Sequence, residues 1–468
     1  MLAKIRSRSV RQSVLLIASF ALYLTWVPWF AAILVTSILI NFLVGKWLRR
    51  RPSGLPLTTG IVFNLALLGV FKYVPQLTLH MGPNPLQNLS RLALPLGISF
   101  WTFQAMSYLF DLYRGEELDP TLVEFALYMV FFPVTISGPV CRMPDMLPQF
   151  RSEETTSAKN ISEGLRRIAV GVFIMQIAKL LGQGILAGDG VVSGFDRLTH
   201  WSGSDVWCLA FGYGLQLFFN FAGYTHIAVG AAKALGIAVP ENFDRPFASA
   251  SPSIFWTRWH MSLSFWIRDY VFFPLAPLRR ELWWRNLALA FSIIVFGLWH
   301  KASLLFLLWG CYHGALLVLH RQVQWAERRF DLNPPPKLWA TLSWLTTTAL
   351  ISLGWVLFRA NSTAQAREML AGVFSPASYS SPVLSLNLYG LVAAIAAGYF
   401  VVLWAADTLD HQVSAFDGQA ATPRGVLAML ARWRWFWIPS LYAIALLFVF
   451  LVTHGQEAST SQFMYRSF

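Results

Sequence analysis

Four ionisable side chains interrupt an apolar stretch at residues 258–275, which reads "RWHMSLSFWIRDYVFFPL"; they are Arg258, His260, Arg268 and Asp269. An ionisable group at the centre of a bilayer costs roughly 2.5–3.5 kcal/mol on insertion scales. We therefore expect these groups to face protein, a water-filled cavity or the membrane interface. A histidine in such a cavity suits proton transfer, because the ordinary pKa of its imidazole lies near neutral pH.

A helix from Ser251 to an interruption at Pro274 would present these groups. Serine is a favourable N-cap, and proline breaks the hydrogen bonding of a helix. On that helix His260, Ser264 and Arg268 lie four residues apart and share one face. The functional interpretation is the wall of a polar membrane cavity. The alternative is an interfacial helix whose arginines bind lipid headgroups.

A second polar line runs through residues 212–230, "GYGLQLFFNFAGYTHIAVG", where Gln216 and Asn220 lie four residues apart on one helical face. Two roles are open for this pair. The side chains can contact a substrate, or they can hydrogen-bond between packed helices. His226 lies nearby in sequence but off that stripe.

Histidines also punctuate residues 296–320, "FGLWHKASLLFLLWGCYHGALLVLH", at His300, His313 and His320. By position alone, each could be a packing residue with a hydrogen-bonded ring nitrogen. Zinc is not expected, since no H-x-x-x-H or HExxH pattern and no nearby cysteine pair occurs. A nucleophile elbow, a Walker loop and a Rossmann fingerprint are also missing from the sequence. Without a serine nucleophile, a sensible chemistry is direct group transfer to a hydroxyl whose proton is removed by a histidine general base.

The composition indicates one polytopic membrane protein. Of 468 residues, 56% are hydrophobic and 13% are charged, whereas a soluble chain is about 25% charged. The 21 tryptophans and 37 phenylalanines suit membrane interfaces and apolar packing. The formal net charge of +13 comes from cations grouped between apolar runs, as at Arg49–Arg51. Such grouping is typical of cytoplasmic loops, and no aromatic–basic module for nucleic acid is visible.

The chain is expected to cross the membrane many times as a single domain, residues 1–468. Apolar segments lie near 13–26, 28–48, 56–75, 92–113, 120–141, 165–187, 205–235, 254–275, 286–299, 302–320, 340–358, 386–406 and 435–453. A span needs about 20 apolar residues, and several segments are shorter or broken, so we predict about eleven spans with some re-entrant or half-buried helices.

The first two segments predict a helical hairpin broken at "WVPW", residues 26–29. Both of its ends are basic, which places residues 1–12 and 46–55 in the cytoplasm. Polar loops are expected near 150–163, 321–338 and 410–433, and none is long enough to be a domain.

The sequence closely resembles the membrane-bound O-acyltransferase family, and within it the bacterial branch that O-acetylates exported polysaccharides such as alginate. The resemblance is carried by "LPLGISFWTFQAMSYLFDLYRG" (94–115), "FALYMVFFPVTISGPVCRMPDMLPQF" (125–150), "PENFDRPFASASPSIFWTRWHMSLSFWIRDYVFFPL" (240–275), "GLWHKASLLFLLWGCYHG" (297–314) and "GWVLFRANSTAQAREML" (354–370). It covers roughly residues 14–375, and the helices of 376–468 match only weakly.

The resemblance implies an all-α bundle around a membrane tunnel in the bacterial inner membrane. It implies an acyl thioester donor from the cytosol, such as acetyl-CoA, with no bound cofactor. The acceptor would be a polysaccharide on the far side, served directly or through a periplasmic partner protein. The catalytic histidine of the family falls on His300, and its second signature histidine falls on His260. We expect the substrate-binding residues to be Arg268, Asp269, Ser264, Asn220, Gln216 and His313.

This sequence departs from the family pattern at several positions. The family's "DFSGYSD" reads "NFAGYTH", so Asn220 and His226 replace acidic residues. Lys301 follows the catalytic histidine where glycine is usual, and the first apolar segment of the branch is expected to be lacking. Two other functions stay open: D-alanyl transfer to teichoic acid, and a transporter or channel without transferase chemistry, which broken helices and buried histidines would also suit.

Overall fold

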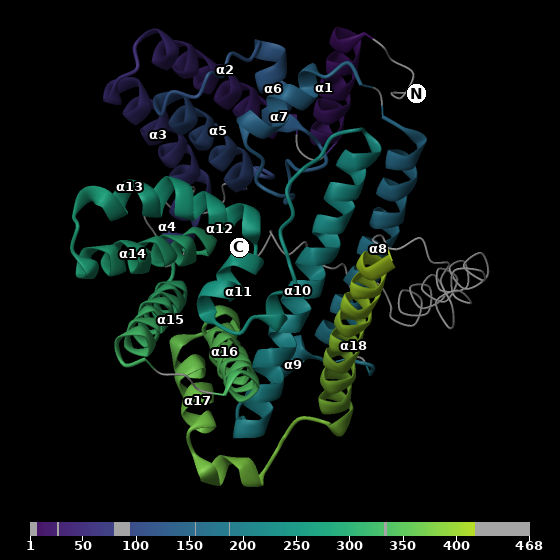
Figure 1. The fold of residues 1–468 in the computed structure, drawn as a ribbon, viewed down its shortest axis with the longest axis vertical. Helices are drawn as coiled ribbons and strands as arrows, with labels where there is room; N and C mark the ends of the chain where they lie inside the picture. Colours follow the sequence, from purple (N-terminus) through teal and green to yellow (C-terminus); the bar gives the residue numbers. More distant parts are fainter. Residues whose placement is uncertain are drawn as a thin grey trace. The chain divides into compact units, whose positions relative to one another are not determined.

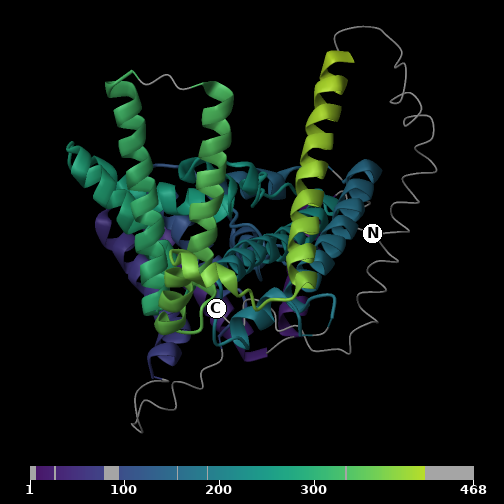
Figure 2. The same ribbon diagram turned by 90° about the horizontal axis from the view of Figure 1, so that it is seen from below.

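The computed structural model describes residues 7–25, 28–78, 94–154, 156–186, 188–331 and 335–416. These residues form helices and their connections, as the course of the ribbon shows (Figures 1 and 2). Among them the only strand-like pairing is an isolated antiparallel bridge between Phe243 and Trp259. The expected all-α class is therefore confirmed.

The described residues fall into two compact units. One unit comprises the residues up to Gly171 together with Tyr224–Thr348, and the other comprises Val172–Gly223 together with the residues from Ala349 onward. Three long helices continue from one unit into the other: α8 (Ala158–Gln183), α10 (Gly203–Ala234) and α16 (Pro336–Arg359).

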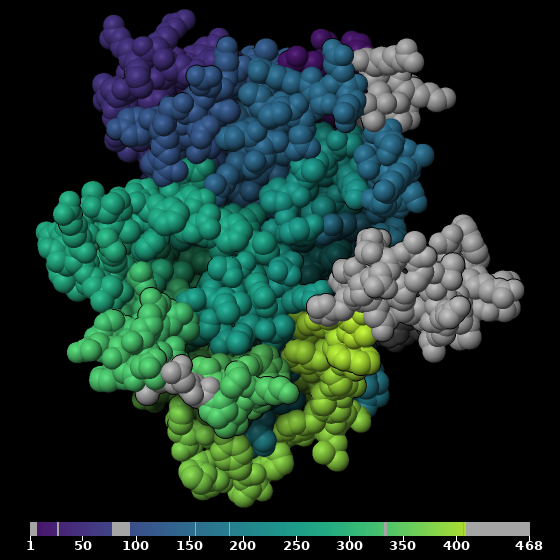
Figure 3. Space-filling view, in the orientation of Figure 1, coloured from purple at the N-terminus to yellow at the C-terminus, as the bar shows by residue number. Residues whose placement is uncertain are grey.

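The first unit begins with a layer of packed helices that forms one continuous region of its surface (Figure 3). They are α1 (Arg8–Leu24), α2 (Pro28–Arg50), α3 (Gly54–Leu68), the π-helix Gly69–Tyr73, α4 (Val74–Thr78), α5 (Ile98–Tyr113), α6 (Leu122–Val130) and α7 (Met143–Arg151). Helix α5 packs against both α2 and α3 and is buried along almost its whole length (Figure 1). Glycine allows this close approach, since a Cβ at Gly45 would lie 2.6 Å from the Tyr108 ring.

The same unit contains the histidine-bearing elements. These are α11 (Pro252–Arg258), α12 (Met261–Ile267), the π-helix Arg268–Phe272, α13 (Phe273–Leu275), α14 (Leu282–His300) and α15 (Leu304–Arg329). Helices α14 and α15 form the most extensively packed pair, which two glycines of α15 permit. A Cβ at Gly310 would lie 2.7 Å from the Ile294 backbone, and one at Gly314 would lie 3.1 Å from that of Ala290. The turn after His300 is thereby held between two tightly packed helices.

The second unit contains α9 (Val191–Asp196), α17 (Thr363–Val373), α18 (Leu386–Phe416) and its portions of the three shared helices. The buried carboxylate of Asp205, at the start of α10, accepts hydrogen bonds from the amides of Val383 and Leu384 and from the Tyr389 hydroxyl. One side chain therefore fixes the start of α10 against the start of α18.

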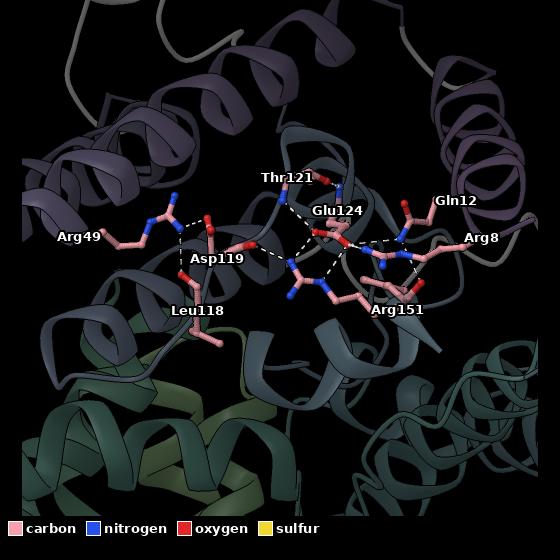
Figure 4. Close-up of polar contacts among 9 residues, drawn as sticks. Arg8, Gln12, Arg49, Leu118, Asp119, Thr121, Glu124 and Arg151 are labelled. Atoms are coloured by element: carbon pink, nitrogen blue, oxygen red, sulfur yellow. Dashed lines mark hydrogen bonds and ion pairs between the residues drawn. The ribbon is translucent and has the colours of Figure 1, made fainter. Parts of the chain in front are cut away.

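A buried carboxylate ties the N-terminal helix of the first unit to two others (Figure 4). Glu124 is fully buried and accepts hydrogen bonds from Arg8, from Arg151 at 3.0 and 2.9 Å, and from Gln12 at 3.4 Å. Glu124 also closes a capping box with Thr121 at the start of α6. Burial alone would raise the pKa of Glu124, but the hydrogen bonds from Arg151, the Thr121 amide and Arg8 outweigh it and lower that pKa to about 2.

The predicted helical hairpin of the first two segments is confirmed, with α1 ending at Leu24 and α2 beginning at Pro28. Both of its ends contact the same segment. Arg8, near the start of α1, bonds to Glu124, while Arg49, near the end of α2, bonds to Asp119 and to the Leu118 carbonyl (Figure 4). The two basic ends therefore lie on one side of the unit. Their cytoplasmic location stays a prediction.

Seven helices of the described part are long and apolar enough to cross a membrane. They are Pro28–Arg50, Gly54–Gln76, Gly203–Ala234, Leu282–His300, Leu304–Arg329, Pro336–Arg359 and Leu386–Ala405. The multi-pass expectation is supported, while the count of about eleven and the tunnel stay predictions. The segments expected at 92–113 and 120–141 give shorter helices, α5 with 16 residues and α6 with 9. The segment expected at 435–453 lies outside the described residues.

The expected polar loops are corrected in part. The loop near 321–338 is mostly helix, since α15 continues to Arg329 and α16 begins at Pro336. Residues 322–329 are mainly good helix formers, and only the prolines at 334–336 break the pattern. Helix α8 likewise begins at Ala158, inside the loop expected near 150–163, and α18 continues to Phe416, inside the loop expected near 410–433. Polarity alone does not end a helix.

Candidate active site

The helix expected from Ser251 is broken at His260. Ser251 caps it as predicted, accepting a hydrogen bond from the Ile254 amide at 3.2 Å. However, α11 ends at Arg258, and His260 adopts the left-handed conformation with φ of 44° before α12 begins. The prediction that His260 shares a helical face with Ser264 and Arg268 is therefore wrong, because His260 lies outside the helix. A left-handed residue other than glycine is strained, so its surroundings must hold it there.

Asn242, which precedes α11 in the chain, stabilises the strained turn at His260. Its carbonyl accepts from the Met261 amide at 2.8 Å, and its Oδ1 accepts from the Ser262 hydroxyl at 2.6 Å. Its amide nitrogen donates to the Thr225 hydroxyl at 3.1 Å, and its side chain is fully buried. Asn242 thus fixes the residues that flank His260. Sequence reasoning missed it, although it lies within the quoted segment 240–275.

Three histidines lie around one aromatic cluster, which we define as Trp256, Phe296, Trp299, Phe306 and Trp309. The His300 ring stacks on Phe296 with a centroid distance of 5.3 Å and an angle of 21°. The His260 ring lies 6.4 Å from the same phenylalanine. His313 meets the cluster at Trp309, with centroids 4.7 Å apart. The structure therefore brings His260, from segment 240–275, together with His300 and His313, from segment 297–314.

The three histidines differ in exposure. His260 is 2% exposed and His313 is fully buried, whereas His300, the last residue of α14, is only half-buried. Within the described part of the chain, neither ring nitrogen of His313 has a hydrogen-bond partner. A reacting histidine must be reached by substrate, so the half-buried ring is the better placed of the three. The catalytic assignment itself stays a prediction.

Two of the residues expected to bind substrate, Arg268 and Asp269, form an ion pair with each other. Arg268 donates to both carboxylate oxygens of Asp269, at 2.7 and 3.2 Å. Arg142 reaches the same carboxylate at 2.6 Å. Burial alone would raise the pKa of Asp269, but the hydrogen bonds from Arg268 and Arg142 outweigh it and lower that pKa below its usual range. Ser264 donates its hydroxyl to the Trp259 carbonyl at 2.9 Å.

Two further arginines join this pair around Tyr270. Arg142 and Arg114 lie over the Tyr270 ring, 5.1 and 5.0 Å from its centroid. The Tyr270 hydroxyl donates to Asp111 at 2.7 Å. We call Arg114, Arg142 and Arg268 the arginine cluster. Sequence reasoning missed Arg114 and Arg142, although both lie in segments quoted for the family resemblance.

A row of aromatic rings links the arginine cluster to His300. Centroid distances are 5.1 Å from Tyr270 to Trp266, 4.4 Å from Trp266 to Phe103 and 5.4 Å from Phe103 to Trp299. The last step, from Trp299 to His300, is 4.7 Å. The Trp266 indole also donates to the Phe103 carbonyl at 3.1 Å, which fixes α12 against α5. A continuous series of ring contacts therefore connects the arginine cluster to His300.

Two other predicted substrate-binding residues belong to the second unit. Gln216 and Asn220 are half-buried in the second unit, where Gln216 packs against Gly182 of α8. Their role in substrate binding stays a prediction. Lys301, which replaces the usual glycine, has an exposed side chain. Among the residues that the structure describes, no group of three or more metal-ligating side chains is found.

The chain matches the family described as MBOAT, the membrane-bound O-acyltransferases, over residues 57–358, and it belongs to this family. The protein is therefore an O-acyltransferase, and the alternative of a transporter without transferase chemistry is not supported.

Three relatives illustrate its similarities. The protein named "Probable alginate O-acetylase AlgI" of Pseudomonas aeruginosa is 33% identical over 84% of this chain and 75% of its own length. The "Peptidoglycan O-acetyltransferase" of Helicobacter pylori is 32% identical over 77% of this chain and 73% of its own. The "Teichoic acid D-alanyltransferase" of Bacillus subtilis is 28% identical over 65% of this chain and 78% of its own.

Proposed function

We propose that this protein carries an acetyl group from a cytosolic thioester across the membrane to hydroxyls of an exported or cell-envelope polysaccharide. The observation that carries the proposal is the half-buried His300 ring at the end of α14, within a cluster that also holds His260 and His313. The names of the alginate and peptidoglycan relatives support an acetyl donor and a glycan acceptor.

In the proposed reaction His300 acts as the general base. Its ring nitrogen accepts the proton of the acceptor hydroxyl while the hydroxyl oxygen attacks the carbonyl carbon of the thioester. The carbon–sulfur bond then breaks, and the thiolate takes up the proton that His300 holds. General-base catalysis of this kind contributes about 10²–10⁴-fold. His260, fixed by Asn242 at the edge of the same cluster, would orient the donor or polarise its carbonyl.

The arginine cluster suits an anionic donor. The guanidinium of Arg268 is half-exposed, with 49% of its side chain accessible, and Asp269 holds it in place. Arg114 and Arg142 lie beside Arg268 around Tyr270, and the accessible part of the Arg268 guanidinium can hydrogen-bond a phosphate. Coenzyme A and phosphopantetheine both carry phosphates. The aromatic row would then lie along the path from the donor phosphate to His300.

D-alanyl transfer to teichoic acid is the second candidate function. It rests on the similarity to the Bacillus subtilis relative, at 28% identity. Both candidates use the same proposed base and a thioester donor, so the acyl group distinguishes them. We also propose a location in the bacterial inner membrane and a periplasmic partner that helps to deliver the acyl group to the glycan.

The test uses purified full-length protein in lipid nanodiscs with acetyl-CoA labelled in the acetyl group. The acceptor is the envelope polysaccharide fraction of the producing bacterium, and alkali-labile label in the glycan is measured. Incorporation that wild type supports and His300→Ala does not would support the proposal. Release of thiol by wild type without labelled glycan would point to a missing partner protein. The absence of thioester turnover with acetyl-CoA, but turnover with a D-alanyl thioester, would favour the second candidate.

A further inference from the structure

Lys72 is a buried cation that the site described so far does not use. It lies in the π-helix Gly69–Tyr73, near the end of the candidate span Gly54–Gln76. A lysine near the end of a span ordinarily extends its ammonium towards the interface. Lys72 is instead 4% exposed. Single-turn π-helical insertions occur frequently at functional sites, because they redirect the side chains of a helix.

The contacts of this segment place Lys72 beside the proposed base. Its Nζ lies 4.5 Å from the centroid of the Trp299 ring, and that ring lies 4.7 Å from His300. Four residues further on, the Gln76 side-chain oxygen accepts a hydrogen bond from the Ala302 amide at 3.1 Å. One face of residues 72–76 is therefore docked onto the end of α14 and the turn that follows His300.

The ammonium of Lys72 forms no ion pair with any residue that the structure describes. Among the described residues, no carboxylate lies within ion-pair distance of it, whereas Arg8, Arg142 and Arg151 each contact one. A buried charge without a counter-ion is unfavourable, and the face of one indole offsets only part of that cost. A cation buried beside His300 can stabilise a negative charge that forms only during the reaction.

We propose that Lys72 is a second catalytic group, which stabilises the oxyanion formed when the thioester carbonyl is attacked. This inference rests on the proposed function of His300. As the acceptor oxygen bonds to the carbonyl carbon, the carbonyl electron pair moves to oxygen, and the Lys72 ammonium donates a hydrogen bond to it. The carbonyl then re-forms, the carbon–sulfur bond breaks, and the thiolate takes the proton from His300. Lys72 keeps its own protons throughout.

The first experiment compares Lys72→Met with Lys46→Met. Lys46 is the matched control, since its Nζ lies 4.6 Å from the Phe42 ring centroid but its side chain is exposed in α2. Thiol release from acetyl-CoA, with envelope polysaccharide as acceptor, is measured for the full-length proteins in nanodiscs. Removing one oxyanion donor typically lowers kcat about 10²–10³-fold. We expect that loss for Lys72→Met with the KM for acetyl-CoA unchanged, near-wild-type values for Lys46→Met, and partial retention of kcat in Lys72→Arg.

A binding measurement keeps the inference falsifiable if turnover is lost for other reasons. It compares two stable analogues of acetyl-CoA, a methyl ketone and an anionic methylphosphonate. We expect Lys72→Met and Lys72→Gln to bind the ketone as wild type does and to lose about 10²-fold in affinity for the phosphonate. If Lys72→Met does not fold, Lys72→Gln supplies the comparison.

Two outcomes overturn the inference without touching the proposed function. One is a Lys72→Met protein with normal kcat while His300→Ala is inactive. The other is an equal loss of affinity for both analogues, which would show a packing role. If wild type itself does not turn over the acetyl thioester, the proposed function fails first.

Discussion

Replacing Glu124 by glutamine should destabilise the first unit by removing the charge that three side chains share. Glu124 is fully buried, and its carboxylate accepts from Arg8, Arg151 and Gln12 while it caps the start of α6 (Figure 4). Glutamine has nearly the same shape. It replaces one acceptor oxygen by a donor group that would face the guanidinium of Arg151.

The magnitude follows from the pKa of Glu124, which the folded state lowers from 4.5 to about 2. At about 1.4 kcal/mol per pH unit this corresponds to about 3 kcal/mol. Arg8 and Arg151 are half-exposed, at 41% and 38%, so solvent screening reduces the value to about 2–3 kcal/mol. Because the folded-state pKa lies below the unfolded one, this stability is fully present above pH 4.5 and is lost as the pH falls towards 2.

The assay is thermal unfolding of the full-length protein in detergent, followed by fluorescence-detected size exclusion between pH 3 and 8. Glu117→Gln is the control, since Glu117 is an exposed carboxylate seven residues earlier. We expect Glu124→Gln to lower the unfolding temperature at neutral pH, and the difference from wild type to shrink as the pH falls below about 4.5. Equal unfolding temperatures for the two variants at neutral pH would refute the reasoning, as would a difference that grows in acid.

Three further predictions concern the site and the topology. His300→Ala should reduce glycan acylation about 10²–10⁴-fold at matched membrane levels, while His313→Ala should reduce it less, because its ring is fully buried. Arg268→Ala should raise the KM for acetyl-CoA more than it lowers kcat, because the half-exposed guanidinium is proposed to bind the donor phosphate. Single cysteines placed in residues 1–12 and 46–55 should resist an impermeant thiol reagent applied outside, because both segments are basic.

Each of these has a clear contrary result. Near-normal activity of His300→Ala together with an inactive His313→Ala would transfer the catalytic role, and activity in both would exclude histidine catalysis. An Arg268→Ala protein with unchanged donor binding and turnover would leave the segment from α12 through the π-helix Arg268–Phe272 as an interfacial anchor. Strong external labelling of either basic segment would reverse the predicted topology.

The sequence by itself determined the helix boundaries and caps that depend on residues close together in the chain. Apolar length and the break at residues 26–29 predicted the α1–α2 hairpin, and Ser251 predicted the cap of α11. Motif resemblance singled out His260, His300 and His313 separately. The hairpin and the cap were predictable because helix starts and apolar runs are fixed by residues within a few positions of one another.

Only the tertiary structure decided how these residues meet. The break at His260 could not be seen in an amphipathic pattern, because the strained turn is held by Asn242, which is itself bonded to Thr225 on another helix. The arginine cluster and the role of Lys72 were also missed, because they depend on contacts between residues that are distant in the sequence. From sequence alone, a cation in an apolar segment is assigned to a loop or to the membrane interface, because its neighbours in space are not known. At Lys72 the neighbour is the Trp299 ring, on a helix more than two hundred residues later in the chain.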